Sequence, residues 1–351
     1  MKPALRCKNV LVLYAELMGY GEATFDAVAG LSETRVTVVQ RDEGRKRSYQ
    51  PDGRESLRIL RRSEFDEGAL VQLYRELAPK LIFISGWMDS EYLTVAKRAR
   101  ADGVPVVSGL DNQWTGSIRQ RLACLAAAFK VRPYFSHIQV AGPRQYEFAR
   151  RLGYSPEKIL FNLYSADSKV FAGEDHRRYP RRLLYVGRFH KNKGLDILAR
   201  AWSQVCDETD WELVAVGSGD DDGGLGSLPR VTLKRFLPPE AVAQEAANAG
   251  AFVLPSLWEA WGVVIHEMAL SGLPLVLSSE CGALTEFLIS NYNGFSFESE
   301  NADHLAECLK GLFLLSEEEL HSMGRRSRNL AGRISSETAA ANLVSVLKNE
   351  R

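Results

Sequence analysis

Cysteine is scarce in this chain and is never paired at a short spacing. The five cysteines lie far apart, without a C-x-x-C pair or any spacing typical of metal ligands: Cys7, Cys124, Cys206, Cys281 and Cys308. This pattern argues against a disulfide-stabilised secreted fold and against a structural zinc site. It fits a protein that works in a reducing compartment.

Long apolar runs are also lacking, although 45% of the residues are hydrophobic. None of the runs has the length that a bilayer-spanning helix needs. The residues Lys2–Lys8 lead into a short strand-like run, whereas a secretory signal would continue into a long apolar region. We therefore expect a cytoplasmic protein.

Net charge is zero as well, but the two halves of the chain differ in sign. Residues 1–170 hold 26 Lys+Arg and 19 Asp+Glu, whereas residues 171–351 hold 18 and 25. The basic excess gathers in Arg41–Arg62. One interpretation is that this stretch contacts an anionic surface, either a membrane or a phosphorylated acceptor. The alternative is a solvated loop. Few aromatic residues accompany it, so we expect no nucleic-acid recognition.

The length of 351 residues is about twice that of a typical domain, which predicts two domains. Strand-like and helix-like patterns alternate in both halves, as in parallel α/β domains. We expect strands near residues 9–14, 35–39, 81–84, 104–108, 137–140 and 158–162, and near residues 182–186, 212–216, 231–234, 251–255 and 274–278. The polar stretch 165–180 predicts a linker. The expected division is therefore 1–170, 171–335 and an amphipathic tail at 336–351.

The segment Ala251–Glu286 carries the clearest functional pattern. An apolar run is followed by a loop with Glu259, and Gly262 then opens a helical pattern that contains Glu267. A helix start directs free N–H groups and the positive end of the helix dipole at the preceding loop, which favours a bound diphosphate. Gly262 has no side chain, so a phosphate can approach its backbone closely. The alternative is that both glutamates are solvated charges beside a core helix.

A second pattern, G-R-x(4)-K-G, follows the first predicted strand of the second half. It places Arg188 and Lys193 between two glycines. Arginine binds phosphate oxygens through parallel N–H bonds, and lysine adds a point charge. A basic surface turn is the alternative. The acidic run Asp220–Asp222 after the next strand could be mistaken for a metal site, but its Gly/Asp-rich surroundings favour a solvated loop.

Together these motifs resemble the donor-binding segments of retaining glycosyltransferases of the GT-B fold, family 4. The E-x7-E pattern and the G-R-x(4)-K-G pattern carry the resemblance, which is specific from about residue 183 to residue 296. It implies two Rossmann-like α/β domains that face each other across a cleft. It also implies that the last helix, in 336–351, returns to the N-terminal domain.

The resemblance implies roles for individual residues. Arg188 and Lys193 would stabilise the diphosphate, Glu259 would hold the donor sugar and Glu267 the ribose. Other contacts with the donor would come from Gly217, Phe236, Trp261, Gly262, Val263, Val264 and Gly282. Phe236 follows Arg235, a position where many relatives have glycine, so the identity of the base stays open.

In the first half, Gly19 and Gly21 would form a glycine loop near the diphosphate and the acceptor. Asp111 ends a predicted strand where many relatives carry a histidine that contacts the transferred sugar, and Trp114 could stack on a sugar. The alternatives are that Asp111 caps a helix at residues 117–127 and that Trp114 belongs to the core.

The implied reaction is retaining transfer of a hexose from a nucleotide-diphosphate sugar to a hydroxyl group. A UDP-hexose is the leading donor and a GDP-sugar the next. The acceptor would be a glycan or a lipid-linked glycan in cell-surface polysaccharide synthesis. No metal and no cofactor are expected.

Three alternatives remain. A nucleotide-sugar epimerase of similar shape would turn over the donor without an acceptor, and a non-catalytic sugar-nucleotide-binding subunit would form no product. A glycosidase would use Glu259 and Glu267 as its carboxylate pair. Eight helical residues would separate them by about 12 Å, however, whereas hydrolysis needs roughly 5–10 Å.

Overall fold

The computed structural model describes residues 9–31, 34–41, 53, 56–173 and 178–348. The chain forms two compact units. Unit 1 comprises Met1–Ser165 and Ile334–Arg351, and unit 2 comprises Ala166–Arg333. The sequence placed these divisions at 170 and 335, a few residues later in each case.

Unit 1 contains a seven-stranded sheet in the order β3-β2-β1-β4-β5-β6-β7, and all of its strand pairs are parallel. Strands β1, β4, β5 and β6 are almost completely buried because helices cover both faces of such a sheet. The strands are β1 (Asn9–Tyr14), β2 (Arg35–Gln40), β3 (Leu57–Arg61), β4 (Leu81–Ile84), β5 (Val106–Leu110), β6 (His137–Val140) and β7 (Ile159–Leu160).

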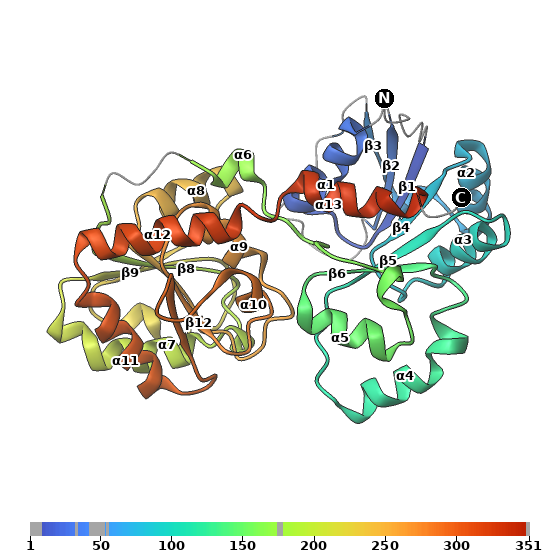
Figure 1. Ribbon diagram of the computed structural model, residues 1–351. Helices are drawn as coiled ribbons and strands as arrows, with labels where there is room; N and C mark the ends of the chain where they lie inside the picture. The colour runs from blue at the N-terminus through green and yellow to red at the C-terminus, as the bar shows by residue number, and fades with distance from the viewer. Residues whose placement is uncertain (1–8, 32–33, 42–52, 54–55, 174–177, 349–351) are drawn as a thin grey trace. The chain divides into compact units, whose positions relative to one another are not determined.

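In the part of unit 1 that the structure describes, five α-helices come from the N-terminal half of the chain and one from its C-terminal end. The C-terminal helix packs against the first helix, as Figure 1 shows, and the Gln139 side chain reaches its Ala339 carbonyl at 3.4 Å. The expected return of the C-terminal helix to the N-terminal domain is therefore confirmed. The helices are α1 (Gly19–Gly30), α2 (Glu67–Leu77), α3 (Ser90–Ala101), α4 (Ile118–Lys130), α5 (Pro143–Arg151) and α13 (Ser336–Val344), which a short 3₁₀ turn (Ser345–Lys348) follows.

Unit 2 contains a six-stranded parallel sheet in the order β10-β9-β8-β11-β12-β13. Its strands are β8 (Arg182–Val186), β9 (Glu212–Val216), β10 (Val231–Lys234), β11 (Ala251–Leu254), β12 (Leu275–Ser278) and β13 (Gly294–Phe297). Its helices are α6 (Ser168–Phe171), α7 (Leu195–Val205), α8 (Pro239–Ala247), α9 (Val263–Leu270), α10 (Leu284–Phe287), α11 (Ala302–Phe313) and α12 (Glu317–Ala331). The predicted class, two parallel α/β domains, is thus confirmed.

The basic stretch Arg41–Arg62 is not one continuous loop. Its last part forms the edge strand β3, which pairs with β2. Two of its arginines form ion pairs with the start of α3: Arg41 with Asp89 at 2.8 Å, and Arg62 with Glu91. Residues 42–52, 54 and 55 lie outside the described residues, so the predicted membrane contact of this stretch stays a prediction.

Within the described ranges, none of the helices combines the length and the apolar character that crossing a membrane requires.

Candidate functional site

The carboxyl ends of the strands in unit 2 bring the predicted donor-binding residues together. Strand β8 lies between β9, which follows it in sequence, and β11. From β8 the chain first adds β9 and β10 on one side and then adds β11, β12 and β13 on the other, so the strand order changes direction next to β8. In open parallel sheets, ligands bind outside the carboxyl ends of the strands at such a switch point. The loops after β8 and β11 carry the two motifs, so the site is built from the place where the topology predicts one.

The loop after β8 holds the two predicted phosphate-binding cations. Buried Tyr185 in β8 donates a hydrogen bond from its hydroxyl to the Arg188 carbonyl at 2.9 Å and thereby fixes the turn. The Arg188 side chain is exposed, whereas Lys193 is half-buried and forms an ion pair with Glu259. Burial and the nearby Glu259 charge raise the pKa of Tyr185, so this hydroxyl stays protonated and available as a donor.

The loops after β8 and β11 are fastened to each other through their main chains. The Leu257 N–H donates to the Asn192 carbonyl at 2.9 Å. Gly194 lies so close to the Pro255 carbonyl that a Cβ at this position would be 2.1 Å from the oxygen. Only glycine permits this approach. Because the two loops are held together, Lys193 and Glu259 meet although 66 residues separate them.

The helix that carries Glu267 begins as the sequence predicts. Gly262 is the N-cap of α9 and has φ +91°, a left-handed conformation that favours glycine. No side chain caps this end of the helix. The Ile265 N–H donates to the Gly262 carbonyl at 2.9 Å, so the N–H groups left without a helical partner at this end are those of Val263 and Val264, which point at the preceding loop. This end of α9 is suited to an anion.

The loop after β12 donates main-chain hydrogen bonds to the loop that carries Glu259. The Gly282 N–H donates to the Glu259 carbonyl at 3.0 Å, and the Ala283 N–H donates to the Trp261 carbonyl at 2.9 Å. The Trp261 ring is only 2% exposed and packs edge-on against Phe287, at 6.2 Å between centroids. Trp261 is therefore packed into the protein at this loop, main chain included.

The loop after β9 extends the same edge of the sheet. Its main chain pairs with the loop after β8, because the Gly187 N–H donates to Val216 and the Phe189 N–H donates to Ser218. The Gly217 N–H donates to the Lys234 carbonyl at the end of β10, at 2.9 Å. Phe236, two residues further on, is 45% exposed. An exposed aromatic ring at a rim of this kind can stack on a planar ligand.

The pKa of the Glu267 carboxyl is shifted from its usual value. Glu267 lies in α9 five residues after Gly262 and is partly buried. Loss of water around its carboxyl raises the pKa of Glu267 from 4.5 to about 7. Such a group changes its charge near neutral pH, which is common at functional sites.

Buried groups hold α9 in place, and sequence reasoning did not identify them. His266 is fully buried, accepts a hydrogen bond from the Ala166 N–H at 3.0 Å through Nδ1, and lies 3.1 Å from the Ala331 carbonyl through Nε2. These partners assign the proton to Nε2. His266 also stacks on Phe287 at 4.4 Å. The histidine therefore ties α9 to the first residue of unit 2 and to the end of α12.

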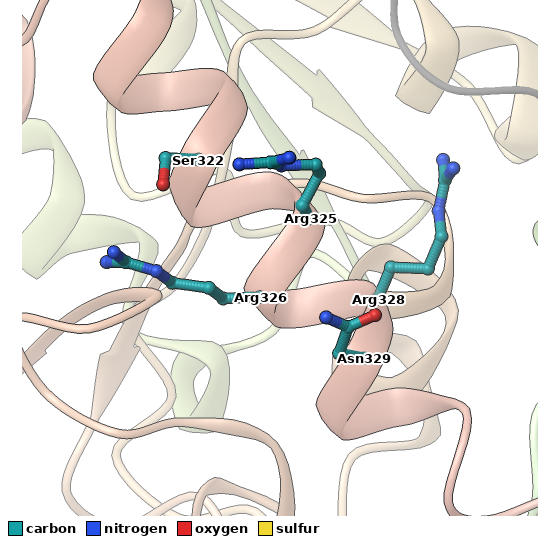
Figure 2. A pocket seen from close by; sticks show the side chains of 5 residues that line it. All are labelled: Ser322, Arg325, Arg326, Arg328 and Asn329. Carbon is teal, nitrogen blue, oxygen red and sulfur yellow. The ribbon is translucent and has the colours of Figure 1, made fainter.

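The far end of α9 is supported by α12. Figure 2 shows a surface pocket lined by residues of that helix: Ser322, Arg325, Arg326, Arg328 and Asn329. The Arg328 guanidinium donates to the carbonyls of Leu270 and Ser271 at 3.1 and 3.4 Å. A cation at the C-terminal end of a helix stabilises it. Arg326 is held by the ring and the carbonyl of Tyr292. This pocket therefore contains arginines that stabilise the fold, and none of the predicted site residues lines it.

In unit 1, Asp111 belongs to a group of tyrosines at the carboxyl edge of the sheet. The Tyr164 hydroxyl donates to Asp111 at 3.2 Å, and the Tyr164 ring meets Tyr20 edge-on at 5.2 Å. Burial raises the pKa values of Tyr14 and Tyr164, with further contributions from Asp111 and from the neighbouring tyrosines. The strand-end position of Asp111 was predicted, but these tyrosines were not.

The contacts of unit 1 bear on the two alternatives given for Asp111 and Trp114. Ser117, not Asp111, caps α4, because its hydroxyl accepts from the Gln120 N–H at 3.3 Å. Trp114 packs on Phe148 at 5.7 Å and lies 4.6 Å from the Arg151 guanidinium, so its described contacts are with α5.

The predicted glycine loop after β1 needs a correction. Gly19 and Gly21 lie in the first turn of α1, whose N-cap is Met18. The Gly21 N–H donates to the Met18 carbonyl at 2.9 Å, so these glycines belong to the start of a helix rather than to a loop.

The acidic run after β9 serves the loop itself. Asp221 accepts from the Gly223 N–H at 3.1 Å, and Asp222 accepts from Gly224 and Gly226 at 3.0 and 3.2 Å. Such turns occupy the carboxylates with the local backbone. Among the residues that the structure describes, no group of three or more His, Cys, Asp or Glu has an arrangement that could hold a metal ion.

Comparison with known proteins bears first on unit 2. Residues 180–314 match the family described as glycosyl transferases group 1. An uncharacterized glycosyltransferase of Methanocaldococcus jannaschii is 30% identical over 133 residues, which are 36% of this chain and 34% of that protein. Spore coat protein SA of Bacillus subtilis is 30% identical over 186 residues, which are 48% and 49% of the two chains. The chain thus spans about a third to a half of the length of these curated relatives.

Comparison of structures covers both units. HepE of Anabaena, crystallised with UDP and glucose, superimposes with a TM-score of 0.73 over 97% of this chain and 99% of that chain, at 16% identity. This chain has the GT-B fold. The group 1 match falls entirely within unit 2 of that fold, the unit that carries the Arg188–Lys193 and Glu259–Glu267 motifs.

Proposed function

We propose that this chain is a retaining glycosyltransferase that moves a hexose from a nucleotide-diphosphate sugar, with a UDP-hexose as the leading donor, to a hydroxyl group. One observation carries the proposal. The Lys193–Glu259 pair and the uncapped start of α9 come together at the switch point of the unit 2 sheet. Cations and free N–H groups at one point fit a diphosphate.

In this proposal the diphosphate binds between Arg188, Lys193 and the N–H groups of Val263 and Val264. Exposed Arg188 is free to rotate onto the phosphate oxygens, and Lys193 moves from Glu259 toward the anion. These donors would stabilise the negative charge that grows on the diphosphate as the sugar leaves. They would also fix the donor in position for attack.

Glu259 and Glu267 would bind two different parts of the donor, the transferred sugar and the ribose. Glu259, in the loop before α9, would accept hydrogen bonds from hydroxyls of the transferred sugar. Glu267, inside the helix, would accept them from the ribose. Phe236 lies at the rim beyond Gly217, where its exposed ring supports a role against the base. Gly282 would keep the loop under the donor free of side chains.

We assign Asp111 to the acceptor and to the transferred sugar. Its carboxylate already accepts a hydrogen bond from Tyr164 and would orient a hydroxyl in the same manner. The acceptor would be a glycan or a lipid-linked glycan. Attack on the face from which the diphosphate leaves would let a phosphate oxygen take the proton, so no strong protein base and no metal ion would be needed.

The relatives support transfer over epimerisation. The matching family is described as glycosyl transferases, and the Methanocaldococcus jannaschii relative as an uncharacterized glycosyltransferase. HepE was crystallised with UDP and glucose. An epimerase would need no acceptor. Incubation of the purified chain with UDP-hexose alone therefore separates the two activities, since only an epimerase changes the sugar of the intact donor.

The direct test is a binding screen followed by transfer. Thermal shifts would be measured with UDP, GDP, ADP and their hexose derivatives, and the best donor would then be offered to glycan acceptors. We expect a nucleoside diphosphate to raise the melting temperature and the linkage of the product to retain the donor configuration. The proposal is wrong if none of the nucleotides binds, or if the product has inverted configuration.

A further inference from the structure

Helix α4 of unit 1 exposes a narrow apolar stripe. Its four large apolar side chains are 78%, 60%, 78% and 82% exposed, in sequence order Ile118, Leu122, Leu125 and Phe129. Their spacing of four, three and four residues places them within about 60° of one another around the helix. The stripe is about 17 Å long, at about 1.5 Å per residue.

The opposite side of α4 attaches the helix to its unit. Ala127 is the buried residue of the helix, and it lies on the side away from the stripe. The core side of α4 thus presents Ala127 and half-buried Cys124, while its largest apolar side chains face outward, the reverse of an ordinary surface helix. Figure 1 shows α4 at the lower end of unit 1. Burial within the unit does not explain the four apolar side chains, so they indicate a partner.

The charges around the stripe identify the kind of partner. Residues 112–146 contain no aspartate or glutamate. Exposed Arg119 and Lys130 lie on one flank of the stripe, and exposed Arg121 lies on the other. An apolar stripe between cations is the pattern of a helix that lies in the interface of an anionic bilayer.

A second copy of the chain fits this surface less well. Two copies of the stripe in contact would bring cations of one copy beside cations of the other, with no acidic residue of α4 to offset them. Paired helices normally place opposite charges along their seam.

We propose that α4 docks this chain on a membrane surface that contains anionic lipid. The apolar side chains of Leu122, Leu125 and their neighbours enter the acyl boundary, and the flanking cations meet lipid phosphates. The helix is 13 residues long, too short to span the bilayer, so it lies along the surface. The proposal does not depend on sugar transfer, because its test measures membrane binding alone.

The test is flotation of the full chain with vesicles of phosphatidylcholine alone or mixed with phosphatidylglycerol. We expect binding to the mixed vesicles at low salt and its loss at high salt. The double variant Leu122→Glu/Leu125→Glu should lose binding. The control Leu314→Glu changes a leucine of unit 2 that is even more exposed, at 86%, and should bind like the parent.

The cations can be tested separately. Arg119→Gln and Lys130→Gln should each weaken binding about fivefold, since a basic residue near an anionic surface contributes about 1 kcal/mol. Melting curves would confirm that the variants fold, and Leu122→Ser/Leu125→Ser would replace the glutamate pair if that pair does not.

Three results would overturn the proposal. One is equal binding, or no binding, to neutral and anionic vesicles. Another is full binding by the folded Leu122/Leu125 variants. The third is a dimer of the parent in sedimentation that these variants abolish, because a second copy would then cover the stripe.

Discussion

Replacing Glu267 with glutamine should stabilise the protein at alkaline pH and much less at acid pH. The Glu267 carboxyl has a pKa of about 7 in the folded chain, against 4.5 in water, because protein replaces its water. Between these two values the folded state holds a proton that the unfolded state has released. The carboxyl therefore contributes stability that is fully present below pH 4.5 and is lost as the pH rises through 7.

The size of the effect follows from the same two values. One pKa unit corresponds to about 1.4 kcal/mol, so the full shift from 4.5 to about 7 changes the free energy of unfolding by about 3 kcal/mol. Between pH 5 and pH 8 the linkage relation gives a loss of about 2.5 kcal/mol for the parent. Glu267→Gln has no charge to bury and escapes this loss. The stability of the variant relative to the parent should therefore rise by about 2.5 kcal/mol from pH 5 to pH 8.

Urea unfolding at both pH values would measure this difference. Glu240→Gln, which removes an exposed carboxylate of the same unit, serves as the control and should show little change with pH. Comparing the two variants cancels the general titration of the chain. A Glu267→Gln effect that is the same at pH 5 and pH 8 would show that this carboxyl titrates as in water, and the argument from burial would fail.

Three further predictions concern the site. Arg188→Ala and Lys193→Ala should each weaken binding of a nucleoside diphosphate by about 1.5–3 kcal/mol in calorimetry, the range for charged hydrogen bonds; unchanged affinity in both variants would refute the assignment. Transfer should continue in excess EDTA, whereas activity that is lost and then restored only by a divalent ion would revive a metal site at Asp220–Asp222. Asp111→Asn should lower kcat and leave the dissociation constant for the diphosphate nearly unchanged, and Tyr164→Phe should act in the same direction but less; parent-like rates and melting in both would remove Asp111 from the site.

The strands that sequence reasoning located best are the buried ones. Runs such as Asn9–Tyr14 and Arg182–Val186 are apolar, short and bounded by turn residues, and the observed bounds are the same. Strand β3 was missed because two of the five residues of Leu57–Arg61 are arginines. Only an edge strand tolerates such charges, and edge position depends on strand order, which local pattern does not contain.

The same limit applies to the site in unit 2. Each motif was visible because its residues are close in sequence: Arg188 near Lys193, and Glu259 near Glu267. The ion pair between Lys193 and Glu259 was not visible, because it depends on β8 and β11 being neighbours. Tyr185 was hidden for another reason. A tyrosine in an apolar strand is expected to belong to the core. Only the structure shows that the Tyr185 hydroxyl also donates a hydrogen bond to the Arg188 carbonyl.

Unit 1 shows why a single residue is harder to interpret than a motif. Asp111 could be placed at the end of a strand, but its partner Tyr164 follows β7, two strands away in the sheet and 53 residues away in the chain. The sequence left open whether Asp111 capped a helix. Since Ser117 fills that position, the Asp111 carboxylate has no helix to stabilise, and its described side-chain bonds are with Tyr164 and Asn112. A change of charge at Asp111 therefore perturbs the tyrosine group and any bound hydroxyl, so a loss of turnover without a loss of thermal stability would report on function rather than on folding.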